Sequence, residues 1–80
     1  MLKVEVFYNG DVDNETPLVA DELKTKYGSD IDVYVQDISI DTAPDAYGII
    51  NAPVVVLGGK EKFQLDGPEG LTSVVTKAIF

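Results

Sequence analysis

A strand–helix–strand pattern in the first half of the chain constrains the fold most. Residues 2–8 and residues 31–37 alternate apolar and polar side chains with a period of two, which is typical of half-buried strands. Between them, residues 16–27 carry apolar side chains at helical spacing. Two strands joined by a helix in so short a segment predict a right-handed crossover with parallel strands. We expect Thr16 to cap this helix and Gly28 to end it in the left-handed conformation.

A hairpin and a helix are predicted at the end of the chain. The apolar run of residues 54–57 is followed by Gly58 and Gly59, which supply the positive φ angles that a tight turn into residues 60–65 needs. Residues 68–79 then predict a last helix. Its inward-facing side chains are expected to be Leu71, Val74, Val75, Ala78 and Ile79.

A short helix is predicted between the second strand and the hairpin. We expect Asp41 or Thr42 to cap it and Gly48 to end it. The predicted order of elements is therefore βαβαββα. A chain of 80 residues has room for one modest core, so we expect a single domain over residues 1–80.

Three short features in residues 42–57 resemble the thioredoxin and glutaredoxin superfamily. Ala43-Pro44 enters the middle helix, Tyr47-Gly48-Ile49 leaves it, and Pro53 opens a hydrophobic strand. This resemblance implies an α/β, thioredoxin-like fold with a four-stranded mixed sheet and helices on both faces. It also implies that the Ala52–Pro53 bond is cis, because a closely similar run in thioredoxins ends in a cis-proline beside the dithiol.

The chain departs from that superfamily because it contains no cysteine. The family's Cys-x-x-Cys motif corresponds approximately to residues 12–15, which read Val-Asp-Asn-Glu here. Dithiol–disulfide exchange requires a thiolate, so this oxidoreductase activity is excluded. The chain also lacks histidine, the commonest acid–base group at neutral pH. We therefore predict a binding domain without a cofactor, and not an enzyme.

The charge of the chain restricts its partners. Fourteen Asp and Glu residues against six Lys and Arg give a net charge of −8. Such a surface repels nucleic acids and anionic membranes and attracts basic proteins. No segment approaches the roughly 20 apolar residues of a membrane span. Met1 leads directly into the first strand, so we expect a cytoplasmic protein.

The resemblance also implies a docking groove beside Pro53. In the family, the backbone of an extended ligand pairs with the residue that precedes the cis-proline, which is Ala52 here. The loop from Gly10 to Glu15 would form the opposite wall. The predicted groove residues are Tyr8, Val12, Asp13, Asn14, Glu15, Asn51, Ala52 and Pro53. We expect a protein or an extended peptide as the ligand, while Tyr8 and Tyr47 serve equally well as core side chains.

Glutathione binding is an alternative that the sequence leaves open. Residues 53–59 are similar to the strand and glycine pair that follow the cis-proline of glutaredoxins, which bind this tripeptide. The start of the last helix argues against it. Pro68 removes an amide donor there, and Asp66 and Glu69 would repel the carboxylates of the tripeptide.

A metal-binding or structural domain is a second alternative. Asp11, Asp13 and Glu15 alternate as the acidic residues of calcium loops do, although the required glycine and the distant bidentate glutamate are absent. Glu5 is the other candidate acid, on the central strand. It shares its predicted face with Lys3, so we interpret this face as solvated and assign Glu5 no acid–base role.

Overall fold

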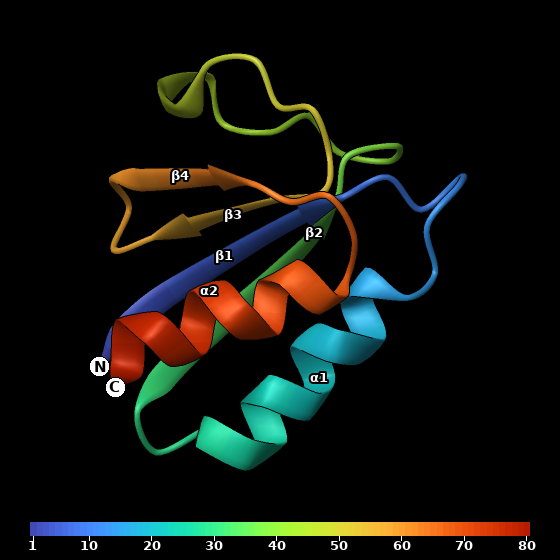
Figure 1. The fold of residues 1–80 in the computed structure, drawn as a ribbon. Coiled ribbons are helices and arrows are strands. Elements are labelled where there is room, and N and C mark those ends of the chain that lie inside the picture. The colour runs from blue at the N-terminus through green and yellow to red at the C-terminus, as the bar shows by residue number, and fades with distance from the viewer.

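A four-stranded mixed sheet organises the computed structural model, which describes residues 1–80. Its strands are β1 (Leu2–Tyr8), β2 (Ile31–Asp37), β3 (Val54–Leu57) and β4 (Glu61–Gln64). The order across the sheet is β2-β1-β3-β4 (Figure 1). β1 and β2 are parallel, and β3 is antiparallel to both β1 and β4. The mixed sheet and the order of the elements predicted from the sequence are confirmed, with a turn of 3₁₀-helix in place of the middle α-helix.

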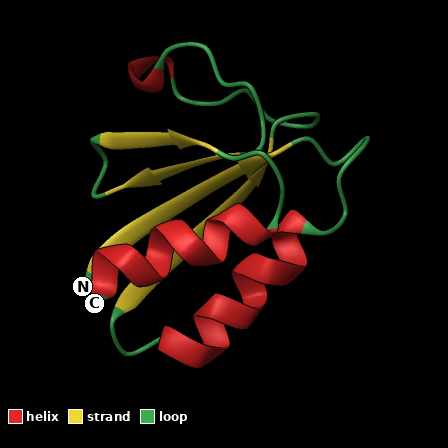
Figure 2. Ribbon diagram, in the orientation of Figure 1, coloured by secondary structure: helices red, strands yellow, loops and turns green.

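Both α-helices cover the same face of the sheet. Figures 1 and 2 show α1 (Thr16–Tyr27) and α2 (Glu69–Ile79) side by side beneath the strands. The main core lies between these helices and the sheet. Its buried residues are Val4, Val6, Ala20, Leu23, Ile31, Val55, Leu57, Leu65, Leu71 and Val75. Neither helix has the length and apolar character needed to cross a lipid bilayer.

The helices differ from the prediction in detail. Leu71 and Val75 face inward as expected, but Val74 and Ile79 are only half-buried and Ala78 is exposed. Gly28 does end α1, but its φ of −60° is not left-handed. A Cβ atom at this position would lie 2.5 Å from the carbonyl oxygen of Lys24, so close packing explains this glycine.

The second face of the sheet carries only one turn of 3₁₀-helix, η1 (Asp45–Tyr47). The middle helix predicted to start at Asp41 or Thr42 is therefore shorter than expected, and neither residue caps it. A residue that precedes a proline is disfavoured in the helical region, and Pro44 follows Ala43 immediately. The helix begins only after Pro44 and ends, as predicted, at Gly48, whose φ is +70°.

A small apolar cluster lies beneath the segment around η1, residues 42–51. Phe7, Val54 and Val56 are buried, and the side chains packed against them are Ile38, Ala43, Tyr47 and Ile50. Polar side chains of the same face hold the main chain of the segment. Lys62 donates to the carbonyl oxygens of Tyr47 and Ile49, at 3.1 and 3.2 Å.

The prediction of a solvated second face is correct only near its edge. Asp32 and Tyr34 on β2 are exposed. Glu5, by contrast, is covered by Tyr47, and its side chain is 14% exposed. Lys3 lies beside it, with its Nζ 3.7 Å from Glu5 Oε1. The segment around η1 therefore shields the centre of this face.

Candidate functional site

Three loops meet in a hollow at one end of the molecule. The hollow measures about 280 Å³, and its lining residues are Val12, Asp13, Asn14, Glu15, Pro53, Asp66, Gly67 and Pro68. They come from the loop before α1, the start of β3 and the loop before α2. Figure 1 shows the two loops that lead into the helices at this same end. Segments more than 50 residues apart thus form a single recess.

The first wall is the loop between β1 and α1, which is tied to the end of β2. The Gly10 amide donates to Asp37 Oδ1 at 2.8 Å. A Cβ atom on Gly10 would lie 2.0 Å from Asp37 Oδ2, so this contact requires glycine. Farther along the loop, the amides of Val12 and Asp13 donate to the carbonyl oxygen of Asn9. The Gly10 bond fixes the loop on the sheet, and the two bonds to Asn9 close a turn within the loop.

Asp37 is held as a carboxylate by the groups around it. The Ser39 hydroxyl donates to Asp37 Oδ1 at 2.6 Å, and the Gly10 and Ser39 amides donate to the same oxygen. The hydroxyl bond contributes most to lowering the pKa of Asp37, and the Gly10 amide follows. The anchor of the loop is therefore charged at neutral pH.

The Asp13 side chain binds the amides at the start of α1, whose N-cap position is Glu15, and Thr16 does not cap the helix, contrary to the prediction from the sequence. Asp13 Oδ1 accepts hydrogen bonds from the Glu15 and Thr16 amides, each at 3.0 Å, and Oδ2 accepts one from the Thr16 hydroxyl. Partial burial alone would raise the pKa of Asp13. The bonds from Thr16 and Glu15 outweigh that effect and lower the pKa. Thr16 is itself buried, in the first turn of the helix.

The second wall is the segment that enters β3. Its Ala52–Pro53 peptide bond is cis. The Pro53 carbonyl oxygen accepts from the Leu65 amide at 3.0 Å, and Gln64 Nε2 donates to the carbonyl oxygen of Asn51. Ala52 lies between Asn51 and Pro53 and differs from both. Its amide and its carbonyl form no hydrogen bond within the protein. A free backbone donor and acceptor thus lie beside the hollow, on a segment fixed at both sides.

The charge of the hollow is negative. Asp13, Glu15 and Asp66 contribute carboxylates, and the lining contains no lysine or arginine. Asp13 is occupied by helix capping, whereas Glu15 and Asp66 are exposed side chains. Val12, which is 84% exposed, adds an apolar side chain to the rim. These features favour an extended segment that carries positive charge.

The predicted groove residues fall into two groups. Val12, Asp13, Asn14, Glu15 and Pro53 line the hollow. Tyr8, Asn51 and Ala52 do not, although Ala52 adjoins Pro53. Tyr8 is half-buried at the end of β1, and Asn51 is an exposed residue whose carbonyl oxygen is held by Gln64. Tyr47 packs on the second face of the sheet, away from the hollow.

Sequence reasoning missed the third wall, residues 66–68. A hairpin reverses the chain, so the end of β4 lies next to the start of β3, where Pro53 is. The loop that follows β4 must therefore pass the same end of the sheet. The Gly58-Gly59 turn was the signal in the sequence that could have placed Asp66, Gly67 and Pro68 beside Pro53.

The alternating acids of the first loop are not gathered into one cluster of carboxylates in the structure. The structure contains no group of three or more His, Cys, Asp or Glu side chains arranged to hold a metal ion. Asp13 points at the first turn of α1, where its oxygens accept the bonds from Glu15 and Thr16. Helix capping accounts for an acidic residue at that position.

Comparison with known proteins supports the fold. No protein-family model and no curated protein sequence matches the chain. Among solved structures, it is similar to the crystal structure of Deadhead, a germline-specific thioredoxin from Drosophila melanogaster. The TM-score is 0.75 at 22% sequence identity, over 95% of this chain and 79% of the other. At this level of sequence identity, the structural similarity supports the same fold but not the same activity. The chain therefore has the thioredoxin-like fold, in a sequence without cysteine.

Proposed function

We propose that this domain is a redox-inactive, thioredoxin-like binding domain that docks an extended, basic segment of a partner protein in the hollow beside Pro53. The observation that carries the proposal is the free backbone of Ala52. Its amide and carbonyl have no partner, while the neighbouring carbonyls of Asn51 and Pro53 do. An extended ligand would pair with this one residue, as in strand addition.

The fixed neighbours of Ala52 make such pairing favourable. Gln64 and Leu65 hold the main chain on either side of it. A donor and an acceptor that are already in place need little ordering when the ligand binds, so less of the binding free energy is lost. The recess next to Pro53 would then accommodate a side chain of the ligand.

The exposed carboxylates would select the ligand. Glu15 and Asp66 lie on opposite walls of the hollow, and neither forms an ion pair. A lysine or arginine of the ligand between these walls would interact with both. Because the carboxylates are exposed, the attraction is screened by salt, and binding should weaken as ionic strength rises.

An amide-resolved titration tests this proposal. The probe is a short peptide of alternating lysine and valine, blocked at both ends, added to the ¹⁵N-labelled chain. We expect saturable shifts at Ala52, Asn14 and Gly67, and slower hydrogen exchange at the Ala52 amide, because that amide gains an acceptor. A peptide with glutamate in place of lysine should produce neither effect.

Matched charge variants locate the binding site. Glu15→Gln/Asp66→Asn should weaken binding of the lysine peptide by about tenfold, the effect of losing two exposed ion pairs. Asp21→Asn/Glu22→Gln makes the same charge change on an exposed part of α1 and should leave the affinity almost unchanged. Equal loss in both variants, or shifts that avoid Ala52, would contradict docking in this hollow.

A further inference from the structure

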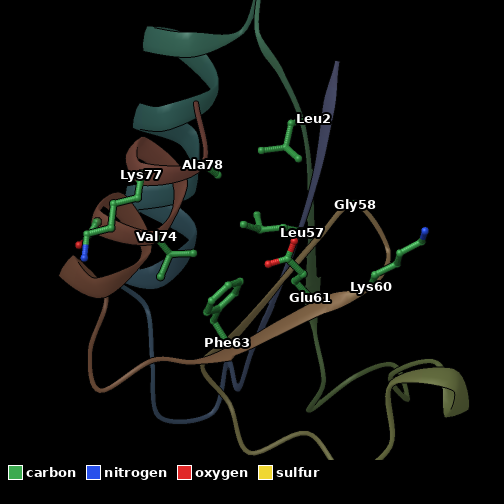
Figure 3. A pocket seen from close by; sticks show the side chains of 10 residues that line it. Leu2, Leu57, Gly58, Lys60, Glu61, Phe63, Val74, Lys77 and Ala78 are labelled. Carbon is green, nitrogen blue, oxygen red and sulfur yellow. The ribbon is translucent and has the colours of Figure 1, made fainter. Parts of the chain in front are cut away.

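A larger hollow lies at the opposite end of the molecule from Pro53. It measures about 580 Å³ and is bounded by the start of β1, the β3–β4 hairpin and the last turns of α2. Figure 3 shows its lining, to which Leu2, Leu57, Phe63, Val74 and Ala78 contribute apolar side chains. This volume lies within the range of about 300–1,000 Å³ that is typical of small-molecule sites.

The hollow exists because α2 is only partly covered. Leu71 and Val75 are fully buried in the main core, so the side of α2 that carries them is already packed against the rest of the protein. Val74 and Ala78 lie on the adjacent stripe, which faces β4, an edge strand with no further neighbour. In Figure 3 the side chains of Leu57, Phe63 and Val74 point into the same space between helix and strands. Apolar surface is thus exposed in a concave arrangement.

The charges around the hollow differ from those of the rest of the protein. The chain has a net charge of −8 and only six basic residues, yet Lys60 and Lys77 both belong to this lining. Neither forms an ion pair, since the ion pair of the structure joins Lys3 and Glu5. In Figure 3 Lys60 extends from the hairpin and Lys77 from the helix, and both side chains are directed away from the centre of the hollow, at its two sides. Glu61 supplies the one carboxylate of the lining.

We infer that this hollow binds an amphipathic monocarboxylate, a small molecule with one acid group on an unbranched apolar body. The body would lie against Phe63, Val74 and Leu2, which are half-buried, and remove their remaining apolar surface from water. The acid group would remain at the mouth, within reach of the flexible side chain of Lys60 or Lys77. Glu61 would repel every acid group of the ligand, so we specify a single one, held at the mouth by a lysine.

A pair of probes that differ only in the head group tests the inference. Sodium octanoate and 1-octanol are titrated separately into the ¹⁵N-labelled chain, below the concentration at which octanoate forms micelles. Octanoate should produce saturable shifts at Phe63, Val74 and the Gly58 turn, with no change at Ala52 or Gly67. It should bind several-fold more tightly than octanol, because only octanoate interacts with the lysines.

Charge variants then distinguish an effect of the two lysines at the hollow from an effect of the net charge of the protein. Lys60→Gln/Lys77→Gln should weaken octanoate binding by about threefold to tenfold and leave octanol unaffected. Lys24→Gln/Lys26→Gln changes the net charge equally, on the exposed end of α1, and should have little effect. Glu61→Gln should tighten octanoate binding. All these side chains are exposed, so the variants should remain folded, which their amide spectra will show.

Three results would overturn the inference. The first is shifts that do not saturate at Phe63 and Val74. The second is equal affinity for octanoate and octanol. The third is an equal loss of octanoate binding in the two lysine variants. None of them bears on the groove beside Pro53, where the lysine peptide is the probe.

Discussion

The Tyr47 hydroxyl donates a hydrogen bond to Glu5 Oε1, with 2.5 Å between the two oxygens. The bond joins the η1 turn to the central strand β1, across 42 positions in the sequence. The ring of Phe7 meets the Tyr47 ring in an edge contact, with centroids 5.9 Å apart. Together these contacts attach the segment around η1 to the second face of the sheet.

We predict that Tyr47→Phe destabilises the protein without changing its fold. The substitution keeps the ring contact with Phe7 but removes the donor to the largely buried Glu5 carboxylate, which loses its hydrogen-bond partner. The midpoint of urea denaturation should fall by about 0.5–1 M. Tyr34→Phe is the control, because the Tyr34 hydroxyl is exposed and forms no hydrogen bond. An unchanged midpoint in Tyr47→Phe would show that Glu5 is solvated after all.

The same contact predicts a loss of stability in alkali. The hydrogen bond to Glu5, followed by burial and by the charge of Glu5, raises the pKa of Tyr47 above its ordinary value. A raised pKa in the folded state stabilises the protein fully below the unfolded pKa of about 10, and this contribution is lost as pH rises through the folded value. Denaturation measured between pH 8 and pH 12 should show a steeper decline in the wild-type chain than in Tyr47→Phe. Parallel declines would argue against the assignment.

Asp13→Ala should destabilise α1 by about 1 kcal/mol, the typical effect of losing a helix cap. Asp11→Ala is the matched control, since it removes a carboxylate of the same loop that accepts no hydrogen bond. Because the pKa of Asp13 is lowered, its contribution is complete above the unfolded value of about 3.9 and is lost as pH falls through the folded value. The stability difference between Asp13→Ala and wild type should therefore shrink in acid. A constant difference from pH 7 to pH 2 would contradict the capping role.

The absence of thiol chemistry can be tested on the wild-type chain and on a variant with two introduced cysteines. The wild-type chain should not accelerate the reduction of insulin disulfides, since it has no thiolate. Val12→Cys/Glu15→Cys places a cysteine pair before the first turn of α1, and this pair should form a reversible disulfide in glutathione redox buffers. Val12→Cys alone serves as the control for a single thiol. A folded double variant whose cysteines stay reduced would show that residues 12–15 do not correspond to the dithiol motif.

Glutathione should bind no more tightly than about 1 mM, which corresponds to about −4 kcal/mol. Asp66 and Glu69 lie at the start of α2 and would repel the carboxylates of the tripeptide there. Amide shifts of Ala52 and Gly70 during a glutathione titration measure this directly. Saturation at micromolar concentration would instead support a glutaredoxin-like function.

The strands and α-helices could be predicted because their side-chain periodicity reflects burial on one face. Val4 and Val6 alternate with Lys3 and Glu5 on β1, and the structure buries the first pair. Helix ends were less predictable. Asp13 and Thr16 are both common capping residues, and only the bonds that Asp13 accepts distinguish them.

The candidate site could be predicted only in part. Two of its walls, residues 12–15 and Pro53, followed from the resemblance to thioredoxins. The third wall, residues 66–68, depends on the pairing of β4 with β3, and the Gly58-Gly59 turn was the only local signal for that pairing. The contact between Tyr47 and Glu5 is likewise a long-range contact, and no periodic pattern reports it. Local sequence patterns therefore predicted the positions of strands and helices better than they predicted the contacts between distant residues.

The attachment of residues 42–51 to the second face of the sheet determines which substitutions this segment tolerates. Lys62 and Gln64 from β4, together with Gln36 from β2, donate to main-chain carbonyl oxygens of this segment. Every amino acid carries such an oxygen, so these bonds do not depend on the side chains of the segment. A substitution at an exposed position such as Asp45 or Ile49 therefore leaves these bonds intact, whereas an apolar substitution of any of the three donors removes its bond.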